Sequence, residues 1–438
     1  MTTYKDAQRL AEKTPPDRNR YVDFLRAASI VVVVLGHWLM TAPQILTDAF
    51  QVDFLLSAAP WTGHLTWILQ VMPIFFLVGG YANAVSWRSS QRKQVAYGTW
   101  LRARLRRLLL PVMPLLAVWT VGAYLLLEGG LDPELVRIGS QGAFVPVWFL
   151  ATYVMVVALT PLTLKAWDRH GWKALIVTGV LAAVVDLVSL GGMGSAQIGV
   201  LNYVFVWGTV HGLGYAWTDS RIGSTTQRLA ASAAGLAATA ALVVFGPYPV
   251  AMVGLVTNGV NNSQPPKVTL LTLAVFQAGL ILALEGPARR WLQRGRAWTG
   301  VVLVNGRIMT LYLWHMTAMV IVIGCLLLVD GFGLGLATAT PEWWLSRPIW
   351  LAVLVVATLP FLLMFGRFER PDADHRPAPP TWQPVAAVAL ACIGLGLLAT
   401  GGVADGAGLN GLALSLPVLA IVIGGVGGLT RLPKGVTS

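Results

Sequence analysis

Residues 21–40 read YVDFLRAASIVVVVLGHWLM, an apolar segment interrupted by Arg26 and His37. About 20 apolar residues, in a helix that rises about 1.5 Å per residue, cross a hydrocarbon core about 30 Å thick. Similar runs recur along the chain, whose 438 residues are 56% hydrophobic and only 11% charged. Because soluble domains carry about 25% charged residues, the sequence predicts an all-α polytopic membrane protein.

The predicted membrane spans number about twelve. The polar first 20 residues lack the short apolar core of a cleaved signal peptide, so we expect the first span to be retained. Cys325 and Cys392 each stand alone in an apolar run, and we therefore expect no disulfide framework and no metal site. The spans lie near residues 21–42, 63–86, 108–127, 146–164, 174–190, 201–217, 229–247, 268–284, 301–328, 349–366, 384–400 and 411–429.

Basic residues are distributed unequally between the two sides of this predicted bundle. Segments on the side of the N-terminus hold 26 of the 31 Lys and Arg residues, whereas the opposite loops hold only Arg137, Lys267 and Arg347. Basic residues collect in cytoplasmic loops, so both termini are predicted to be cytoplasmic. The net charge of +12 is then a topology signal, and no nucleic-acid partner is expected.

Ionisable residues inside the spans are the candidates for chemistry, because burying a charge in a bilayer costs a few kcal/mol. Arg26 and His37 are 11 residues apart and share one helix face, with the histidine deeper in the membrane. Arg307 and His315 repeat this arrangement in the span 301–328, which runs in the same direction. If the two helices are neighbours, the four side chains line one polar tunnel. Asp186 reaches the level of the histidines and could orient a ring nitrogen.

Each of these residues also has a structural interpretation. Arg26 and Arg307 could extend toward the cytoplasmic headgroups as ordinary topology signals. His315 could be a packing residue, and Asp186 could pair with a neighbouring helix.

The cytoplasmic segment 88–107 contains seven basic residues and no acidic one. Arg104 and Arg107 are three residues apart, which places them on one helical face. Such a pair suits a phosphate or diphosphate. The alternative is positive-inside topology combined with binding of anionic lipid headgroups.

Four motifs occur in order along the chain. They are Arg26 with His37, the basic turn RLRRLLLP (Arg104 to Pro111), VPVWFLATY (Val145 to Tyr153) and IMTLYLWH (Ile308 to His315). Together they resemble the membrane acyltransferase-3 family, whose members acylate hydroxyls of sugars and related acceptors, usually with acetyl-CoA as donor. The resemblance covers about residues 20 to 366.

The resemblance implies roles for several residues. His37 matches the essential histidine of the first family motif and Arg26 its arginine, while Arg104 and Arg107 match the paired arginines of the second. We expect a cytoplasmic tail (1–20), a ten-helix acyltransferase core (21–366), a cytoplasmic linker (367–383) and two additional helices (384–438). These extra helices stand where many relatives carry an extracytoplasmic domain, so a stand-alone enzyme of the plasma membrane is implied.

The expected reaction moves a short acyl group, acetyl by the resemblance, from cytosolic acyl-CoA to a hydroxyl of a glycan, glycolipid or glycosylated small molecule. A neutral His37 could act as general base, because an ordinary histidine pKa lies near 6.5. An acyl-imidazole intermediate is the alternative. Arg307 would help to hold the donor, and His315, with Tyr312 nearby, would position the acceptor or the thioester carbonyl.

Two functions without chemistry compete with this one. A twelve-helix secondary transporter would also show cytoplasmic termini and intramembrane Arg, His and Asp. A glycan or lipid flippase is the other alternative. No outer-loop motif identifies the acceptor: Trp61, Trp343 and Trp344 could stack on a pyranose, but tryptophan is common at membrane interfaces. Membrane lipids are the remaining expected partner.

Overall fold

The computed structural model describes residues 4–15, 18–46, 49–191, 196–254, 259–369, 376–406 and 408–427. The chain is mostly helical, at 77%. Eight helices in the described part are long and apolar enough to cross a membrane, or ten if each of two bent helix pairs is one span. The helical membrane fold is therefore confirmed, with eight to ten supported spans where the sequence predicted about twelve.

Four of the predicted spans are shorter or broken in the structure, and each difference has a local cause. Helices α11 (Asn202–Thr218) and α19 (Gly411–Ile423) have only 17 and 13 residues. The span predicted across Pro111 is bent by 43° between α6 and α7, since proline removes a helical hydrogen bond. The span 301–328 is two helices, because α15 ends at Asn305 and α16 begins at Ile308.

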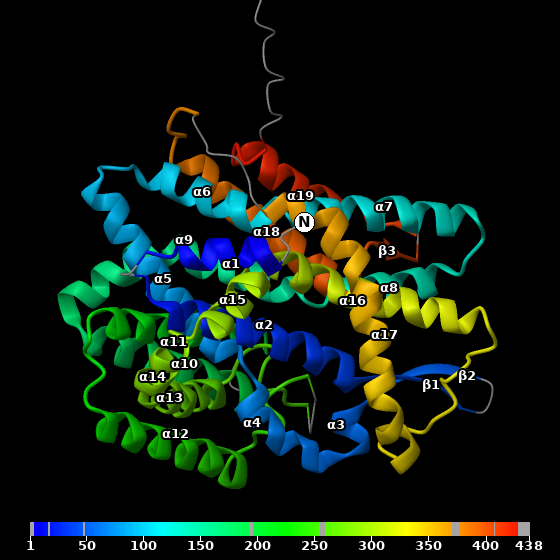
Figure 1. Cartoon of the computed structure of the whole chain (residues 1–438), viewed down its shortest axis with the longest axis horizontal. Coiled ribbons are helices and arrows are strands. Elements are labelled where there is room, and N and C mark those ends of the chain that lie inside the picture. Colours follow the sequence, from blue (N-terminus) through cyan, green and yellow to red (C-terminus); the bar gives the residue numbers. More distant parts are fainter. Residues whose placement is uncertain are drawn as a thin grey trace, which may run out of the picture. The chain divides into compact units, whose positions relative to one another are not determined.

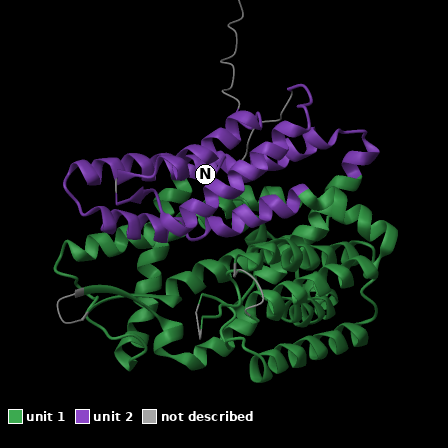
Figure 2. Ribbon diagram, turned by 180° about the vertical axis from the view of Figure 1, so that it is seen from behind, with its two compact units in different colours: residues 1–88, 159–364 green, residues 89–158, 365–438 purple. Residues whose placement is uncertain are grey.

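The chain divides into two compact units, which Figure 2 colours separately. Unit 1 comprises residues 1–88 and 159–364, and unit 2 comprises residues 89–158 and 365–438. This grouping does not follow the sequence order of the expected tail, core and added helices. The segment expected to be a plain tail contains helix α1 (Tyr4–Glu12), and the last two helices belong to unit 2.

Unit 1, green in Figure 2, holds most of the helices. They are α1, α2 (Arg20–Met40), α3 (Leu55–Ala58), η1 (Pro60–Leu65), α4 (Thr66–Leu69), most of α5 (Met72–Arg92), the second half of α9 (Val147–His170), α10 (Trp172–Leu190), η2 (Ala196–Leu201), α11, α12 (Thr225–Phe245), α13 (Val268–Ala283), α14 (Glu285–Trp291), α15 (Gly295–Asn305), α16 (Ile308–Leu327) and α17 (Pro341–Phe365). A hairpin of β1 (Thr41–Leu46) and β2 (Ala49–Phe54) follows α2 directly, with Ala42 opposite Asp53.

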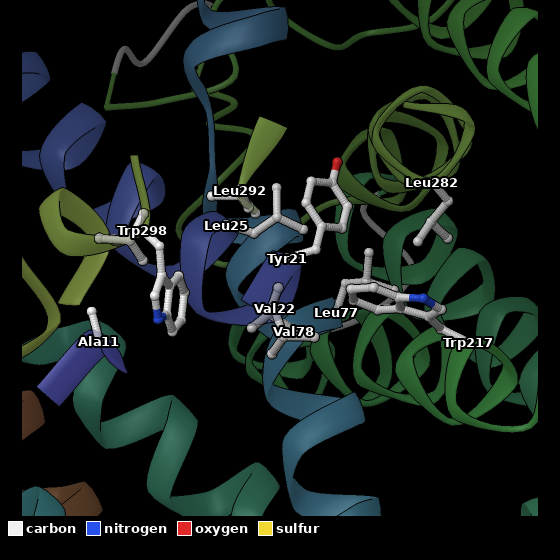
Figure 3. Close-up of a cluster of buried hydrophobic side chains, with 12 residues drawn as sticks. Ala11, Tyr21, Val22, Leu25, Leu77, Val78, Trp217, Leu282, Leu292 and Trp298 are labelled. Carbon is white, nitrogen blue, oxygen red and sulfur yellow. The ribbon is translucent and has the colours of Figure 1, made fainter. Parts of the chain in front are cut away.

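Helix α2 is anchored in the hydrophobic core of unit 1. The side chain of Asn19 caps its first turn by accepting from the Tyr21 amide. Figure 3 shows Tyr21, Val22 and Leu25 meeting side chains from α5, α11, α13 and the segment that leads into α15. The Tyr21 hydroxyl donates to the carbonyl of Ile281 at 2.6 Å. These contacts fix the start of the helix that carries Arg26 and His37.

Unit 2 is a smaller helical assembly. It holds the first half of α9, α6 (Tyr97–Leu109), α7 (Val112–Glu128), α8 (Pro133–Phe144), η3 (Gly366–Glu369), α18 (Trp382–Gly401), the short pair β3 (Ala404–Asp405) and β4 (Gly408–Leu409), and α19. Helix α18 lies alongside α19 and also packs on α6 and α8 (Figure 1). Arg102 of α6 is 4% exposed and donates to the carbonyls of Arg376 and Pro377, which ties the segment before α18 to this unit.

Candidate active site

Helices α2 and α16 lie side by side in unit 1 and run in the same direction. Near their starts, Arg26 of α2 contacts Asn305, three residues before α16 begins. Further along both helices, His37 contacts His315. The two helices are therefore neighbours, and the two histidines meet between them, as their positions along the two predicted spans suggested.

The two histidine rings form a directed hydrogen-bonded pair. Nδ1 of His37 lies 2.9 Å from Nε2 of His315, and the ring planes differ by 5°. Nδ1 of His315 lies 2.8 Å from the backbone carbonyl of Tyr312. A carbonyl can only accept, so Nδ1 of His315 carries the proton of its neutral ring and Nε2 accepts. His37 must then donate from Nδ1, which leaves a lone pair on its Nε2.

The surroundings hold this pair in place and leave one side open. His315 is completely buried, whereas His37 is half-buried, and its Nε2 has no hydrogen-bond partner in the described part of the chain. The Trp38 indole donates to the His315 carbonyl at 3.0 Å, which clamps α2 to α16. Tyr312 is 2% exposed, with its ring centroid 6.3 Å from that of His315. An oriented, half-buried imidazole with an available nitrogen can accept a proton or attack an electrophile.

Arg26 is held in a polar network at the start of α2. Its Nε and Nη2 both donate to Oδ1 of Asn305, at 3.0 and 2.8 Å, and Nη2 also lies 3.2 Å from Asp23. Asn305 donates to the Asp23 carbonyl at 2.9 Å. Arg18 forms a second ion pair with Asp23, and this hydrogen bond raises the pKa of the Arg18 guanidinium. Sequence reasoning missed Asn305, for which the only signal was its position just before the Gly306–Arg307 break.

Arg307 lies at the break between α15 and α16. The predicted continuous helix is wrong here: Arg307 is the N-cap residue of α16, and its backbone angles, φ −137° and ψ 20°, are not helical. Its side chain is half-buried and makes no hydrogen bond or ion pair with any residue that the structure describes. Among the described residues Arg307 is thus a cation without a counter-charge, two residues beyond the amide that holds Arg26.

Asp186 does not contact the histidines, and the prediction that it orients an imidazole is wrong. It is 1% exposed, and its oxygens accept from Asn202 at 2.8 Å, the Val268 amide at 2.6 Å and Tyr248 at 3.3 Å. Lys267, itself 4% exposed, completes a buried ion pair at 3.5 Å. Asp186 therefore joins the end of α10 to the start of α13, which is the structural alternative.

Arg104 and Arg107 belong to α6 in unit 2. Arg104 is half-buried with its guanidinium 5.7 Å from the Trp100 ring centroid, and Arg107 is exposed. The two guanidinium groups are close enough to repel each other, as their shared helical face predicts. In the described residues, no group of three or more His, Cys, Asp or Glu side chains could hold a metal ion.

The apolar helices, with a directed histidine pair between two of them, define an integral membrane protein with a polar site inside its helical bundle. The family model of the acyltransferase-3 family, described as an acyltransferase domain, matches residues 19–367, and the chain belongs to this family. The protein is therefore a multi-pass membrane acyltransferase. Comparisons with curated proteins and with solved structures gave no match.

Proposed function

We propose that this acyltransferase moves a short acyl group, acetyl in the simplest case, from cytosolic acyl-CoA to a hydroxyl of a glycan, glycolipid or glycosylated small molecule. We place the reaction in the plasma membrane. The observation that carries the proposal is the directed His37–His315 pair, because it leaves Nε2 of His37 ready to take a proton. Membership of the acyltransferase-3 family favours acyl transfer over transport or lipid flipping.

In the proposed step, Nε2 of His37 removes the proton of the acceptor hydroxyl while that oxygen attacks the carbonyl carbon of the thioester. The new C–O bond forms, the C–S bond breaks, and the proton on His37 passes to the departing thiolate. As an alternative, Nε2 attacks the carbonyl carbon first, and an acyl-imidazole then delivers the acyl group to the hydroxyl. Atoms and charge balance in both schemes without a further reactant.

Arginines are proposed to bind the phosphates of the donor, because a guanidinium matches phosphate oxygens in charge and geometry. No counter-charge to Arg307 lies in the part of the chain that the structure describes, which supports its assignment to this role, and Tyr312 is proposed to lie on the way from it to the histidines. Arg26 is already held by Asp23 and Asn305, so we assign it to donor placement at the same end of α2. Arg104 and Arg107 are proposed as further phosphate ligands, on the basis of their shared face and of the family motif.

The decisive experiment measures acyl transfer and thioester hydrolysis by the purified protein with radiolabelled acetyl-CoA. His37→Ala should lower the rate at least about 100-fold, the usual contribution of a general base, while donor binding persists. His170→Ala, at the exposed end of α9, is the matched control and should leave the rate unchanged. A folded His37→Ala protein with near-normal turnover would show that the assignment is wrong. Radiolabel found on His37 after rapid denaturation at neutral pH would favour the acyl-imidazole scheme.

A further inference from the structure

Four tryptophans and one arginine form a cluster in unit 1, at the start of α17. We call Trp61 of η1 together with Trp343, Trp344, Arg347 and Trp350 of α17 the Trp–Arg cluster. Trp343 and Trp344 meet edge to face at 4.9 Å, and Trp344 lies 6.5 Å from Trp61. The guanidinium of Arg347 lies 4.2 Å from the Trp343 ring centroid and 5.6 Å from that of Trp350.

Arg347 is a buried cation that lacks an acidic partner. It is 9% exposed, and its hydrogen bonds go only to the Trp343 carbonyl and the Ser346 hydroxyl of its own helix. Within the described ranges, no Asp or Glu lies within ion-pair distance of Arg347, and its Nη1 makes no hydrogen bond. Buried arginine is ordinarily paired with a carboxylate, since an uncompensated charge is costly to desolvate. The environment of Arg347 thus lacks one anion.

The Trp–Arg cluster is connected to the histidine pair through two indole hydrogen bonds. Nε1 of Trp350 donates to the carbonyl of Trp38 at 3.0 Å, and Trp38 is the residue after His37. Nε1 of Trp38 donates in turn to the His315 carbonyl. The Trp–Arg cluster is therefore joined, through Trp350, to the end of α2 that carries His37.

The exposed rings of the cluster suit a sugar. Trp61 is 59% exposed and Trp344 is 38% exposed, and their planes are inclined by only 36°. Aromatic rings present an apolar face, on which the C–H groups of a pyranose can pack. An interfacial aromatic belt would explain exposed tryptophans, but it would not require a buried arginine beneath them.

We propose that the Trp–Arg cluster binds the acceptor and that the acceptor carries a negative substituent, a carboxylate or a phosphate ester, on or next to the stacked pyranose. Arg347 receives that substituent, while Trp61 and Trp344 contact the ring. This inference rests on the proposed function, because it names the acceptor class for the same histidine pair. Binding is nevertheless measurable without acyl transfer, so the two proposals can fail separately.

The test measures binding of methyl β-D-glucuronide and methyl β-D-glucoside to the full-length protein in phosphatidylcholine nanodiscs, by saturation-transfer NMR. We expect the glucuronide to bind about tenfold more tightly, as a charge-assisted bidentate pair provides. Arg347→Gln should abolish this preference, and Arg347→Lys should retain part of it. Arg137→Gln, which removes a half-buried arginine that is paired with Glu134 and is also predicted on the outer side, should leave it unchanged. Trp344→Ala should weaken both sugars equally.

Several outcomes would overturn the proposal. Equal affinities for the two sugars, no binding of either, or a preference that persists in a folded Arg347→Gln protein would each do so. Loss of the preference on adding phosphatidylglycerol to the nanodiscs would assign Arg347 to a lipid headgroup instead. Methyl glucoside 6-phosphate is the third ligand, and its affinity relative to the glucuronide separates phosphate from carboxylate acceptors. Glucuronide binding by a His37→Ala protein without any acyl transfer by the wild type would uphold this site and refute the proposed reaction.

Discussion

Replacing His315 tests whether it controls the protonation of His37. In the structure its Nε2 accepts from Nδ1 of His37 at 2.9 Å, while its Nδ1 is held by the Tyr312 carbonyl. Because His315 is fully buried, His315→Ala would add a cavity and confuse stability with catalysis. His315→Leu fills the space without an acceptor, whereas His315→Gln places an amide oxygen where Nε2 lies.

The magnitude follows from two effects of losing the acceptor. If His37 then populated both neutral tautomers equally, the fraction of molecules in which Nε2 of His37 is free to accept a proton would fall only about twofold. The larger effect is on the imidazolium that forms as His37 takes the proton, since a hydrogen bond to a charged group contributes about 1.5–3 kcal/mol. That range corresponds to about a 10- to 150-fold loss of rate, because about 1.36 kcal/mol is a factor of ten.

The assay is acetyl transfer by purified protein, with kcat and the KM for acetyl-CoA measured separately. We expect His315→Leu to lose kcat by this factor with little change in KM, and His315→Gln to recover most of it. Size-exclusion profiles and Tm values establish that both variants are folded. A His315→Leu enzyme within threefold of the wild-type kcat, or a Gln variant as impaired as the Leu variant, would refute the tautomer argument.

Three further predictions concern the charged groups around the bundle. Asn305→Ala removes the amide oxygen that holds the arginine of α2 and should raise the KM for acetyl-CoA about tenfold, as steady-state kinetics would show. Arg307→Gln should raise the same KM with kcat preserved, whereas Arg289→Gln, an exposed partner of a glutamate, should have no effect. Burial raises the pKa of the Asp219 carboxyl, but hydrogen bonds from Arg88 and a tryptophan indole lower it below its usual value. Its contribution to stability is therefore complete above about pH 4 and is lost as the pH falls further, so the Tm deficit of Asp219→Asn should shrink in acid.

Hydropathy and charge were sufficient to predict a helical membrane protein, and helix periodicity placed the two histidines at a common depth. The contact between His37 and His315 follows from these local rules once α2 and α16 are neighbours. Hydropathy did not reveal the break before Arg307, because the residues on both sides of it are apolar. Hydropathy also did not predict where α11 and α19 end. Both helices are apolar but have only 17 and 13 residues, fewer than the helices that are long enough to cross a membrane.

The partners of the polar residues depend on tertiary contacts that the sequence does not display. Asp186 bonds to Tyr248 and Lys267, more than 60 residues further along the chain. Asn305 meets Arg26 across 279 residues, and nothing in its local sequence distinguishes it from an ordinary helix end. The hairpin after α2 was not predicted either. Its two strands pair with each other, and their backbone also bonds to the loop after α16, a distant contact that the local sequence does not indicate.

The group that orients His315 would allow the proposed base to be kept inside an apolar bundle. A carboxylate in that position would add a buried charge, which in hydrocarbon is costly and favours a protonated, inactive imidazole. The Tyr312 carbonyl fixes the same tautomer without carrying a charge. In the proposed mechanism both rings can then remain neutral between turnovers, and a charge arises only while His37 holds the proton of the acceptor. Asp186 pairs with Lys267, away from the histidines, and so places no charge beside either imidazole ring.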